Sequence, residues 1–98
     1  MTRRLIVRPE AELDIEEATS WYESRWPSLG VRFTDQLGQL LQQIANNPFQ
    51  FPEVEHGVRR GLLHRFPYAV YFATAEEIIA VLAVLHQHRH PDLWKQRI

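Results

Sequence analysis

The chain has 98 residues, of which 45% are hydrophobic and 23% charged, with a formal net charge of −1 and no cysteine. This balance is typical of one globular domain and excludes an intrinsically disordered chain, a disulfide framework and a thiolate metal site. The longest uncharged apolar run, residues 78–85, is too short to cross a membrane, and the apolar run at 5–7 is too short for a signal peptide. We therefore expect one cytoplasmic domain over residues 1–98, with no membrane partner.

The charges are distributed unevenly along the chain. Residues 1–55 contain five Arg and nine Asp or Glu, whereas residues 56–98 contain six Arg or Lys, three Asp or Glu and all five His. A basic surface formed by the second part could bind an anionic partner. So small an imbalance is also compatible with an ordinary solvated surface of mixed charge. Charge alone therefore does not select a partner.

The first half of the chain predicts a strand followed by two helices. Residues 3–8 are short and β-branched and end at Pro9, which suits the first turn of a helix. Apolar residues then recur at helical spacing in 10–26 and in 31–46, with a turn containing Pro and Gly at 27–30. Helices joined by so short a turn pack antiparallel. We therefore predict a helical hairpin, with an irregular connection at 48–57.

The second half predicts an antiparallel meander of three strands, at 58–66, 68–74 and 77–86. Residues 78–85 are apolar at every position, so the last strand should be central and covered on both faces. By strict alternation, the odd-numbered residues 79–85 share one face and the even-numbered residues 78–84 the other. The helical hairpin can cover only one face. Either the sheet curls over its second face, or a partner chain covers it.

Four segments, taken in order, resemble the ParE/RelE family of toxins from bacterial toxin–antitoxin pairs. They are residues 11–18 (AELDIEEA) with 21–23 (WYE), 44–48 (IANNP) with 51–52 (FP), 58–60 (VRR) with 65–72 (RFPYAVYF), and 81–86 (VLAVLH) with Arg89 and Pro91. No single segment is specific to the family, but together they span nearly the whole chain. The resemblance implies an α+β fold of order β-α-α-β-β-β, with a helical hairpin packed on a curved antiparallel sheet.

The resemblance also implies a protein partner. Toxins of this kind are held inactive by a cognate antitoxin whose C-terminal segment wraps the toxin, giving a toxin–antitoxin hetero-oligomer. The antitoxin would cover the open face of the sheet or a groove beside the helices. For that groove we select the apolar residues Ile15, Tyr22, Phe33, Leu37 and Leu41.

The family divides by mechanism. ParE-like members act on DNA gyrase and trap its cleaved DNA complex, whereas RelE-like members cut messenger RNA on the ribosome. The segments Trp21-Tyr22, Phe66-Pro67-Tyr68 and Leu85-His86 are more similar to ParE. The first hypothesis is therefore a growth inhibitor that targets gyrase and has no chemistry of its own. The alternatives are a ribosome-dependent endoribonuclease and a degenerate toxin kept only as a binding module.

Cationic and aromatic side chains of the second half are the candidate target contacts. The candidates are Arg59, Arg60, Arg65, His86, Arg89 and Trp94. Arginine can bind phosphate oxygens through two donors at once. The other interpretation of the arginines is an edge strand kept soluble by charge. Trp94 lies in a basic tail, where it could stack on a base or dock on the domain.

A ribonuclease would need phosphate-stabilising cations and a group that moves a proton. The candidates are Arg60 and Arg65 for the phosphate and His86 for the proton, although His86 could instead cap the core with one nitrogen hydrogen-bonded. His88 and His90 flank Arg89, but a pair of histidines at this spacing with no carboxylate between them makes a weak site, so we expect no metal site. We also expect no cofactor, since no nucleotide-binding motif is present.

Two groups in the first helix are expected to be structural. The acidic residues Glu10, Glu12, Asp14, Glu16 and Glu17 should form its solvated face. The aromatic residues Trp21, Tyr22 and Trp26 should lie in the core.

Overall fold

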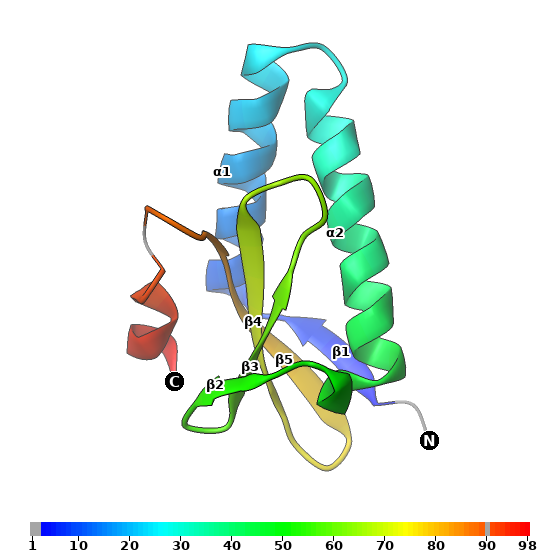
Figure 1. Cartoon of the computed structure of the whole chain (residues 1–98), viewed down its shortest axis with the longest axis vertical. Coiled ribbons are helices and arrows are strands. Elements are labelled where there is room, and N and C mark those ends of the chain that lie inside the picture. Colours follow the sequence, from blue (N-terminus) through cyan, green and yellow to red (C-terminus); the bar gives the residue numbers. More distant parts are fainter. Residues whose placement is uncertain (1–2, 90) are drawn as a thin grey trace.

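The fold is a helical hairpin packed on a five-stranded sheet, seen in a computed structural model that describes residues 3–89 and 91–98 (Figure 1). The helices are α1 (Pro9–Arg25) and α2 (Leu29–Asn46). The strands are β1 (Arg4–Val7), β2 (Glu53–Glu55), β3 (Val58–Leu62), β4 (Tyr68–Thr74) and β5 (Ile78–His86). Short 3-10 turns, η1 (Pro48–Gln50) and η2 (Leu93–Arg97), complete the chain. The predicted α+β class and the helical hairpin are confirmed.

The strands lie in the order β1-β5-β4-β3-β2. Strands β2 to β5 pair antiparallel, which confirms the predicted meander, whereas β1 pairs parallel with β5. The hairpin of α1 and α2 lies in the connection between β1 and the other strands, and a long connection of this kind is what parallel pairing requires. The sheet is therefore mostly antiparallel, with one parallel edge strand.

Two strands, β2 and β3, differ most from the predicted elements. β2 lies within the stretch predicted to be irregular. The sequence did not indicate this strand, because its geometry comes from pairing with β3 rather than from its own residue pattern. β3 ends at Leu62 instead of residue 66, since Arg65 has a φ of 72°, in the left-handed region that breaks an extended strand. Leu63 N–H donates to Tyr68 O (2.9 Å), which closes the resulting loop.

A carboxylate from α1 caps the start of α2. Glu23 accepts the N–H of Ser28 on Oε2 and the N–H of Gly30 on Oε1, both at 3.0 Å. These bonds satisfy N–H groups that a helix N-terminus leaves without partners, and a negative charge there suits the helix dipole. The helix thus begins at Leu29, two residues before the predicted start.

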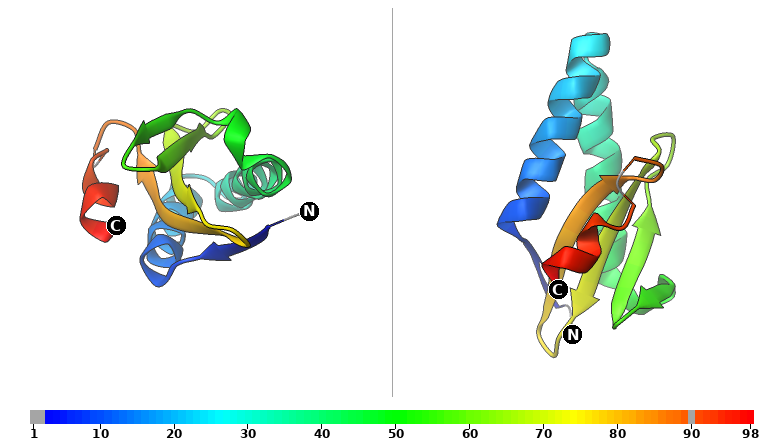
Figure 2. Two further views of the ribbon diagram at one scale, coloured as in Figure 1. Left: turned by 90° about the horizontal axis from the view of Figure 1, so that it is seen from below. Right: turned by 90° about the vertical axis from the view of Figure 1, so that its left-hand side faces the viewer.

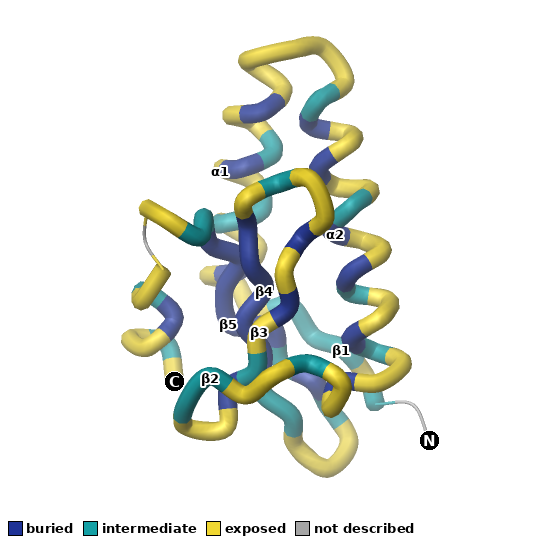
Figure 3. The backbone as a smooth tube through the Cα atoms, in the orientation of Figure 1, coloured by how far each residue is buried: buried dark blue, intermediate teal, exposed yellow. Residues whose placement is uncertain are grey.

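The larger core lies between the helices and one face of the sheet (Figure 3). Phe33 and Ile44 of α2, Ala11 of α1, and Phe72 and Val81 of the sheet are all fully buried. Aromatic rings of Tyr22, Phe33, Phe66 and Tyr68 pack edge-on or stacked at 4.9–6.0 Å near the upper end of the sheet. The hairpin therefore covers one face of the sheet, as predicted.

A β-bulge at Leu82 changes which face the later residues of β5 occupy. Tyr71 pairs with Ala83 and Phe72 with Val81, so Leu82 is an extra residue on its strand. Val81 and Val84 consequently both join the core beneath the helices, whereas Ala83 and Leu85 join a second cluster on the opposite face. The predicted strict alternation is wrong beyond Val81, because a strand apolar at every position carries no pattern that would mark the bulge.

The chain covers the second sheet face itself. Trp94 of η2 is 3% exposed and stacks on Tyr71, with ring centroids 5.4 Å apart and planes 15° from parallel. Val58, Leu82 and Leu85 complete this second cluster, and η2 lies across β5 from the helices (Figure 2). Of the two alternatives for this face, cover by a partner chain is therefore not needed, since the curled sheet and the tail enclose it together.

Candidate functional site

A cleft of about 230 Å³ opens beside the upper end of β5. It is lined by Asp14, Glu17, Ala18 and Trp21 of α1, Tyr68 of β4, Val84, Leu85 and His86 of β5, and Arg89 and Leu93 of the tail. The cleft exists because β1 is short: its pairing with β5 stops at Val7 and Val81, although β5 continues to His86. Beyond that point α1 and the tail face the edge of β5 directly.

Asp14 and Arg97 close the lower part of this edge. Arg97 donates from Nη1 to Asp14 Oδ2 (2.6 Å) and from Nη2 to Asp14 Oδ1 (3.1 Å). The same Nη1 also donates to Leu82 O (3.1 Å), and Asp14 Oδ2 accepts the N–H of Val84 (3.0 Å). Both side chains are mostly buried, so Asp14 does not belong to the solvated face predicted for it.

His86 lies on the wall of the cleft against Tyr68, with ring centroids 5.3 Å apart. Its Nδ1 accepts the N–H of His88 (3.1 Å), which leaves Nε2 as the other titratable position. Burial lowers the pKa of His86 below its ordinary value, and the positive charges of Arg89 and His88 lower it further. The neutral imidazole is thus the form that this site favours.

Tyr68 has a hydroxyl that the same surroundings keep protonated. Burial raises the pKa of Tyr68, and Arg89 opposes that shift while Glu17 and Asp14 add to it. A neutral phenol beside a neutral imidazole provides hydrogen-bonding capacity without charge. The other ionisable side chains that line the cleft are Arg89, Glu17 and Asp14.

Two guanidinium groups lie over the ring of Trp21. The Cζ atom of Arg25 is 4.5 Å from the ring centroid and that of Arg89 is 5.5 Å from it. Trp21 is 40% exposed and Trp26, at the tip of the hairpin, is 71% exposed. The prediction that these two tryptophans lie in the core is wrong, whereas Tyr22 is buried as predicted.

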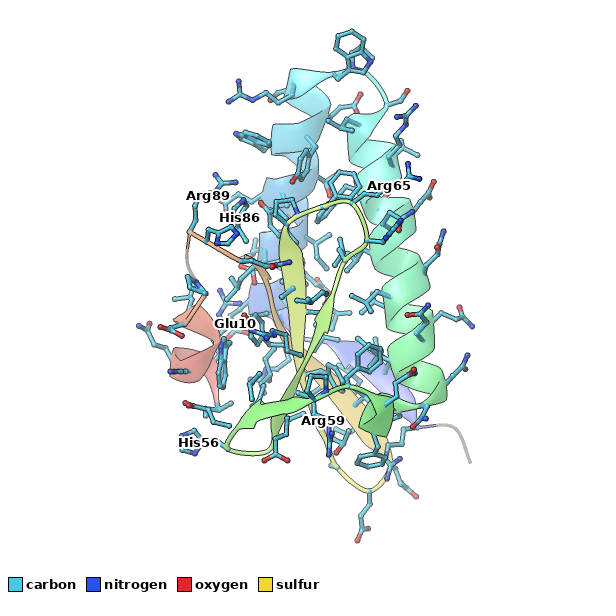
Figure 4. All side chains as sticks on the ribbon, viewed as in Figure 1. Glu10, His56, Arg59, Arg65, His86 and Arg89 are labelled. Carbon is cyan, nitrogen blue, oxygen red and sulfur yellow. The ribbon has the colours of Figure 1, made fainter. Side chains whose placement is uncertain are left out.

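The predicted target-binding residues lie in several separate places (Figure 4). Arg59 packs against η1, where it donates to Phe51 O (2.6 Å) and lies 4.0 Å from the carboxylate of Glu53. Arg65 is exposed in the β3–β4 loop. Only His86 and Arg89 line the cleft beside β5.

Arg60 and Trp94 belong to a second, smaller cleft. That cleft, of about 190 Å³, is also lined by Glu55 and Lys95, whose charged groups are 3.5 Å apart. Arg60 and His86 therefore open onto different clefts. The three candidate catalytic residues, Arg60, Arg65 and His86, are not brought together around one reacting group.

Most of the residues selected for antitoxin binding fill the core of the chain itself. Tyr22, Phe33 and Leu37 are 8%, 0% and 4% exposed, while Ile15 and Leu41 are partly buried against the same cluster. A partner could reach the first three side chains only if the core opened. The role of all five in antitoxin binding stays a prediction, and of the five only Ile15 and Leu41 have side chains that a partner could reach in part.

Sequence reasoning missed Asp14, Trp21, Arg25 and Arg97 as members of the cleft and its surroundings. One signal was available: Asp14, Ala18 and Trp21 recur at helical spacing beside the apolar stripe of α1, so they share a face of that helix. Arg97 gave no such signal, because it is 83 residues from Asp14 in sequence. His90, also discussed above, lies outside the described residues.

Together, these elements define a small α+β domain of the helical-hairpin-on-sheet type. Residues 5–91 match the family model described as the ParE toxin of type II toxin–antitoxin systems, parDE. The protein called Toxin ParE2 of Mycobacterium tuberculosis is 32% identical over 93 residues, which cover 94% of this chain and 89% of the mycobacterial protein. The chain therefore belongs to the ParE toxin family.

A solved structure agrees with this fold. A chain in the chromosomal ParDE TA system from P. aeruginosa superposes with a TM-score of 0.77 at 18% identity, over 87% of this chain and 96% of that one. At that identity the likeness concerns the fold alone. In the part of the chain that the structure describes, neither helix is long and apolar enough to cross a lipid bilayer.

Proposed function

We propose that this chain is the growth-arresting toxin of a two-gene pair, that a cognate antitoxin neutralises it in the cytoplasm, and that its target is DNA gyrase. The observation that carries the toxin role is the family match over residues 5–91. The antitoxin partner is supported by the P. aeruginosa relative in fold, which comes from a ParDE TA system. The structure adds a surface with two clefts that a protein partner can contact.

The separation of the candidate catalytic groups supports a target-binding mechanism over ribonuclease chemistry. Attack by a ribose 2′-hydroxyl needs a proton acceptor and a phosphate-stabilising cation around one phosphate. His86 and Arg60 line different clefts, so one bound phosphate would not meet both. Gyrase binding needs only exposed contact residues, and Arg60, Arg65 and Arg89 provide them.

Induction of the chain in a bacterial host tests the toxin role. We expect growth to stop, and we expect co-expression of the short reading frame beside its gene to restore it. Arg60→Ala, Arg65→Ala and Arg89→Ala should each weaken the arrest. Arg4→Ala is the matched control, because Arg4 is an exposed cation on β1, away from both clefts. Normal growth at full expression of the folded protein would contradict the toxin role.

A supercoiling assay with purified gyrase tests the target. We expect loss of supercoiling and accumulation of cleaved DNA as the toxin is added. Unchanged supercoiling at stoichiometric excess would contradict the choice of gyrase. Primer extension on messenger RNA after induction distinguishes the alternative, since cuts confined to codon boundaries would indicate a ribosome-dependent nuclease.

A further inference from the structure

The ten arginines differ in whether the chain itself uses their guanidinium groups. Four of them contact a backbone carbonyl or a carboxylate: Arg3, Arg8, Arg59 and Arg97. The other six make no side-chain hydrogen bond or ion pair with any residue that the structure describes: Arg4, Arg25, Arg32, Arg60, Arg65 and Arg89. Four of these six lie in the part of the molecule around the α1–α2 turn, which we call the hairpin end (residues 17–36, 63–67 and 86–89). The hairpin end therefore contains most of the arginines whose donors are unused.

Two of these arginines are held over one ring on the α1 side of the hairpin end. Arg25 and Arg89 lie over Trp21, at 4.5 Å and 5.5 Å from its centroid, and both side chains are exposed. The ring of Trp21 in turn packs edge-on against Tyr22, with centroids 5.1 Å apart. A cation–π contact places a guanidinium group without consuming its N–H donors. The donors of this pair are thus positioned and available to an anion.

The other two arginines lie on the α2 side, next to the same aromatic cluster. Arg65 directly precedes Phe66 and Arg32 directly precedes Phe33, and the two rings pack edge-on at 5.4 Å. Arg65 has a φ of 72°, a conformation that glycine would adopt without strain. Strained non-glycine residues are concentrated at functional sites. Figure 4 shows Arg65 and Arg89 on opposite sides of the β3–β4 loop, so the hairpin end has cationic groups on both sides of this loop.

Three carboxylates also belong to the hairpin end and leave it a small positive excess. Glu23 uses both of its oxygens on the backbone N–H groups of Ser28 and Gly30. Glu17 lines the cleft beside β5 and Asp35 is exposed on α2, and neither pairs with an arginine of the described chain. So small an excess predicts weak binding of anions that depends strongly on salt.

We infer that the hairpin end binds the phosphate backbone of a nucleic acid duplex, with arginines on both sides of the β3–β4 loop, and does not read the base sequence. A guanidinium group binds phosphate oxygens through two parallel hydrogen bonds. A duplex carries about one negative charge per 1.7 Å of its axis, so several arginines meet phosphates at the same time. The inference goes beyond the proposed function, because it concerns contact with nucleic acid and holds whether or not gyrase is the target.

A duplex fits these observations better than a single strand or an acidic protein. Proteins that bind single strands stack successive bases on several open rings. At the hairpin end the ring of Trp21 is occupied by two guanidinium groups, which leaves Trp26, 71% exposed, as the open tryptophan. A lone carboxylate on a protein would satisfy one arginine, whereas cations on both sides of a loop match a polyanion whose charges are closely spaced.

Fluorescence anisotropy with the full chain and a labelled DNA duplex of about 20 base pairs tests the inference. At low salt we expect a Kd on the order of 10⁻⁵ M that is the same for two unrelated sequences, with a slope of log K against log salt of about −3 to −4. Arg25→Gln, Arg32→Gln, Arg65→Gln and Arg89→Gln should each weaken binding about two- to fivefold and reduce the slope by about 1. An RNA duplex of the same sequence distinguishes the two sources of this backbone, since the tighter of the two identifies the natural one.

Arg4→Gln is the matched control, because Arg4 is exposed and unpaired in the described chain but lies on β1, outside the hairpin end. It should change neither the affinity nor the slope, and Trp26→Ala should leave the affinity unchanged because no base is stacked. An equal loss in Arg4→Gln, or loss of binding in Trp26→Ala, would overturn the inference. Competition by polyglutamate as strong as that by DNA of equal charge, or no binding of either duplex at about 10⁻⁴ M folded protein, would overturn it as well.

Discussion

Arg97 reaches across the open edge of β5 to Asp14, and the two side chains together supply the hydrogen bonds that a longer β1 would have made. The Asp14 carboxylate accepts the N–H of Val84 while Arg97 donates to the carbonyl of Leu82. This ion pair therefore joins α1 to β5 and η2, which lie more than fifty residues later in the sequence. It also fixes the tail in the position where Trp94 covers the second face of the sheet.

Asp14→Asn should destabilise the fold strongly. The Asp14 and Arg97 side chains are 11% and 14% exposed, so removing one charge leaves its partner poorly solvated. Breaking a buried pair costs about 3–5 kcal/mol, and the residual exposure here places the expected loss nearer ~2–3 kcal/mol. Chemical denaturation of the purified protein measures it.

Asp35→Asn is the control for the loss of one negative charge, since Asp35 is exposed on α2. It should change the free energy of unfolding by less than about 0.5 kcal/mol. The double variant Asp14→Asn with Arg97→Gln should lose less than the sum of the two single losses, because the charges act on each other. Additive losses would argue against direct coupling.

Sequence patterns predicted the hairpin and the meander because both follow from local periodicity. The remaining features depend on contacts between distant residues. β2 has only three residues, with Glu at both ends, and becomes a strand through pairing with β3. The bulge at Leu82 lies in a run where every residue is apolar, so no alternation exists to be interrupted. Neither feature has a local signature.

Gly30 should tolerate alanine poorly. A Cβ at this position would lie 3.0 Å from Glu23 Oε1, 3.0 Å from Thr19 O and 3.1 Å from Glu23 Cβ. Gly30→Ala should therefore push Glu23 away from the N-terminus of α2 and cost about 1–3 kcal/mol. Thermal unfolding followed by circular dichroism measures the loss.

Gly38→Ala, in the same helix, is the matched control. A Cβ there meets no atom within 4 Å, so alanine should stabilise the helix by about 0.5–1 kcal/mol through its higher helix propensity. The two substitutions should thus shift the melting temperature in opposite directions. A shift of the same sign for both would contradict the close packing at Gly30.

Trp94→Ala should expose the second face of the sheet. Trp94 is buried against Tyr71, and removal of a buried tryptophan costs about 3–5 kcal/mol. The uncovered apolar surface should bind a hydrophobic dye. It should also make the variant self-associate, so that it elutes earlier on size exclusion. Trp26→Ala removes an exposed tryptophan and should cause neither change. An equally stable Trp94→Ala protein would show that the tail is not what covers this face.

The candidate site was harder to predict than the fold, because its groups come from four parts of the chain. His86 and Arg89 were selected as cationic side chains of the second half of the chain, and they do line one cleft. Arg59 was selected on the same ground, yet its side chain donates to Phe51 O. The sequence therefore identified cationic residues. It could not distinguish a guanidinium group bound to a backbone carbonyl, such as that of Arg59, from one that faces solvent, such as that of Arg89.

Arg89→Gln should raise the pKa of His86. Burial is the largest cause of its lowered pKa, and the charge of Arg89 is the next. Removing that charge should bring the pKa part of the way back toward 6.5, since the burial remains. Titration of the His86 imidazole resonance measures the change. Arg4→Gln should leave the titration as it is, and an unchanged pKa in Arg89→Gln would exclude the influence of Arg89.

Acidification should weaken the fold through His86. Because the pKa of His86 is lowered in the folded state, the unfolded chain takes up a proton first as the pH falls below about 6.5. Protonation of the unfolded chain then favours unfolding, and this loss of stability continues down to the pKa of the folded state. Well above pH 6.5 both states hold a neutral imidazole and His86 contributes no pH dependence. His86→Gln should therefore flatten the stability profile below pH 6.5, measured by denaturation at a series of pH values. A profile as steep as that of the natural chain would place the proton uptake on another residue.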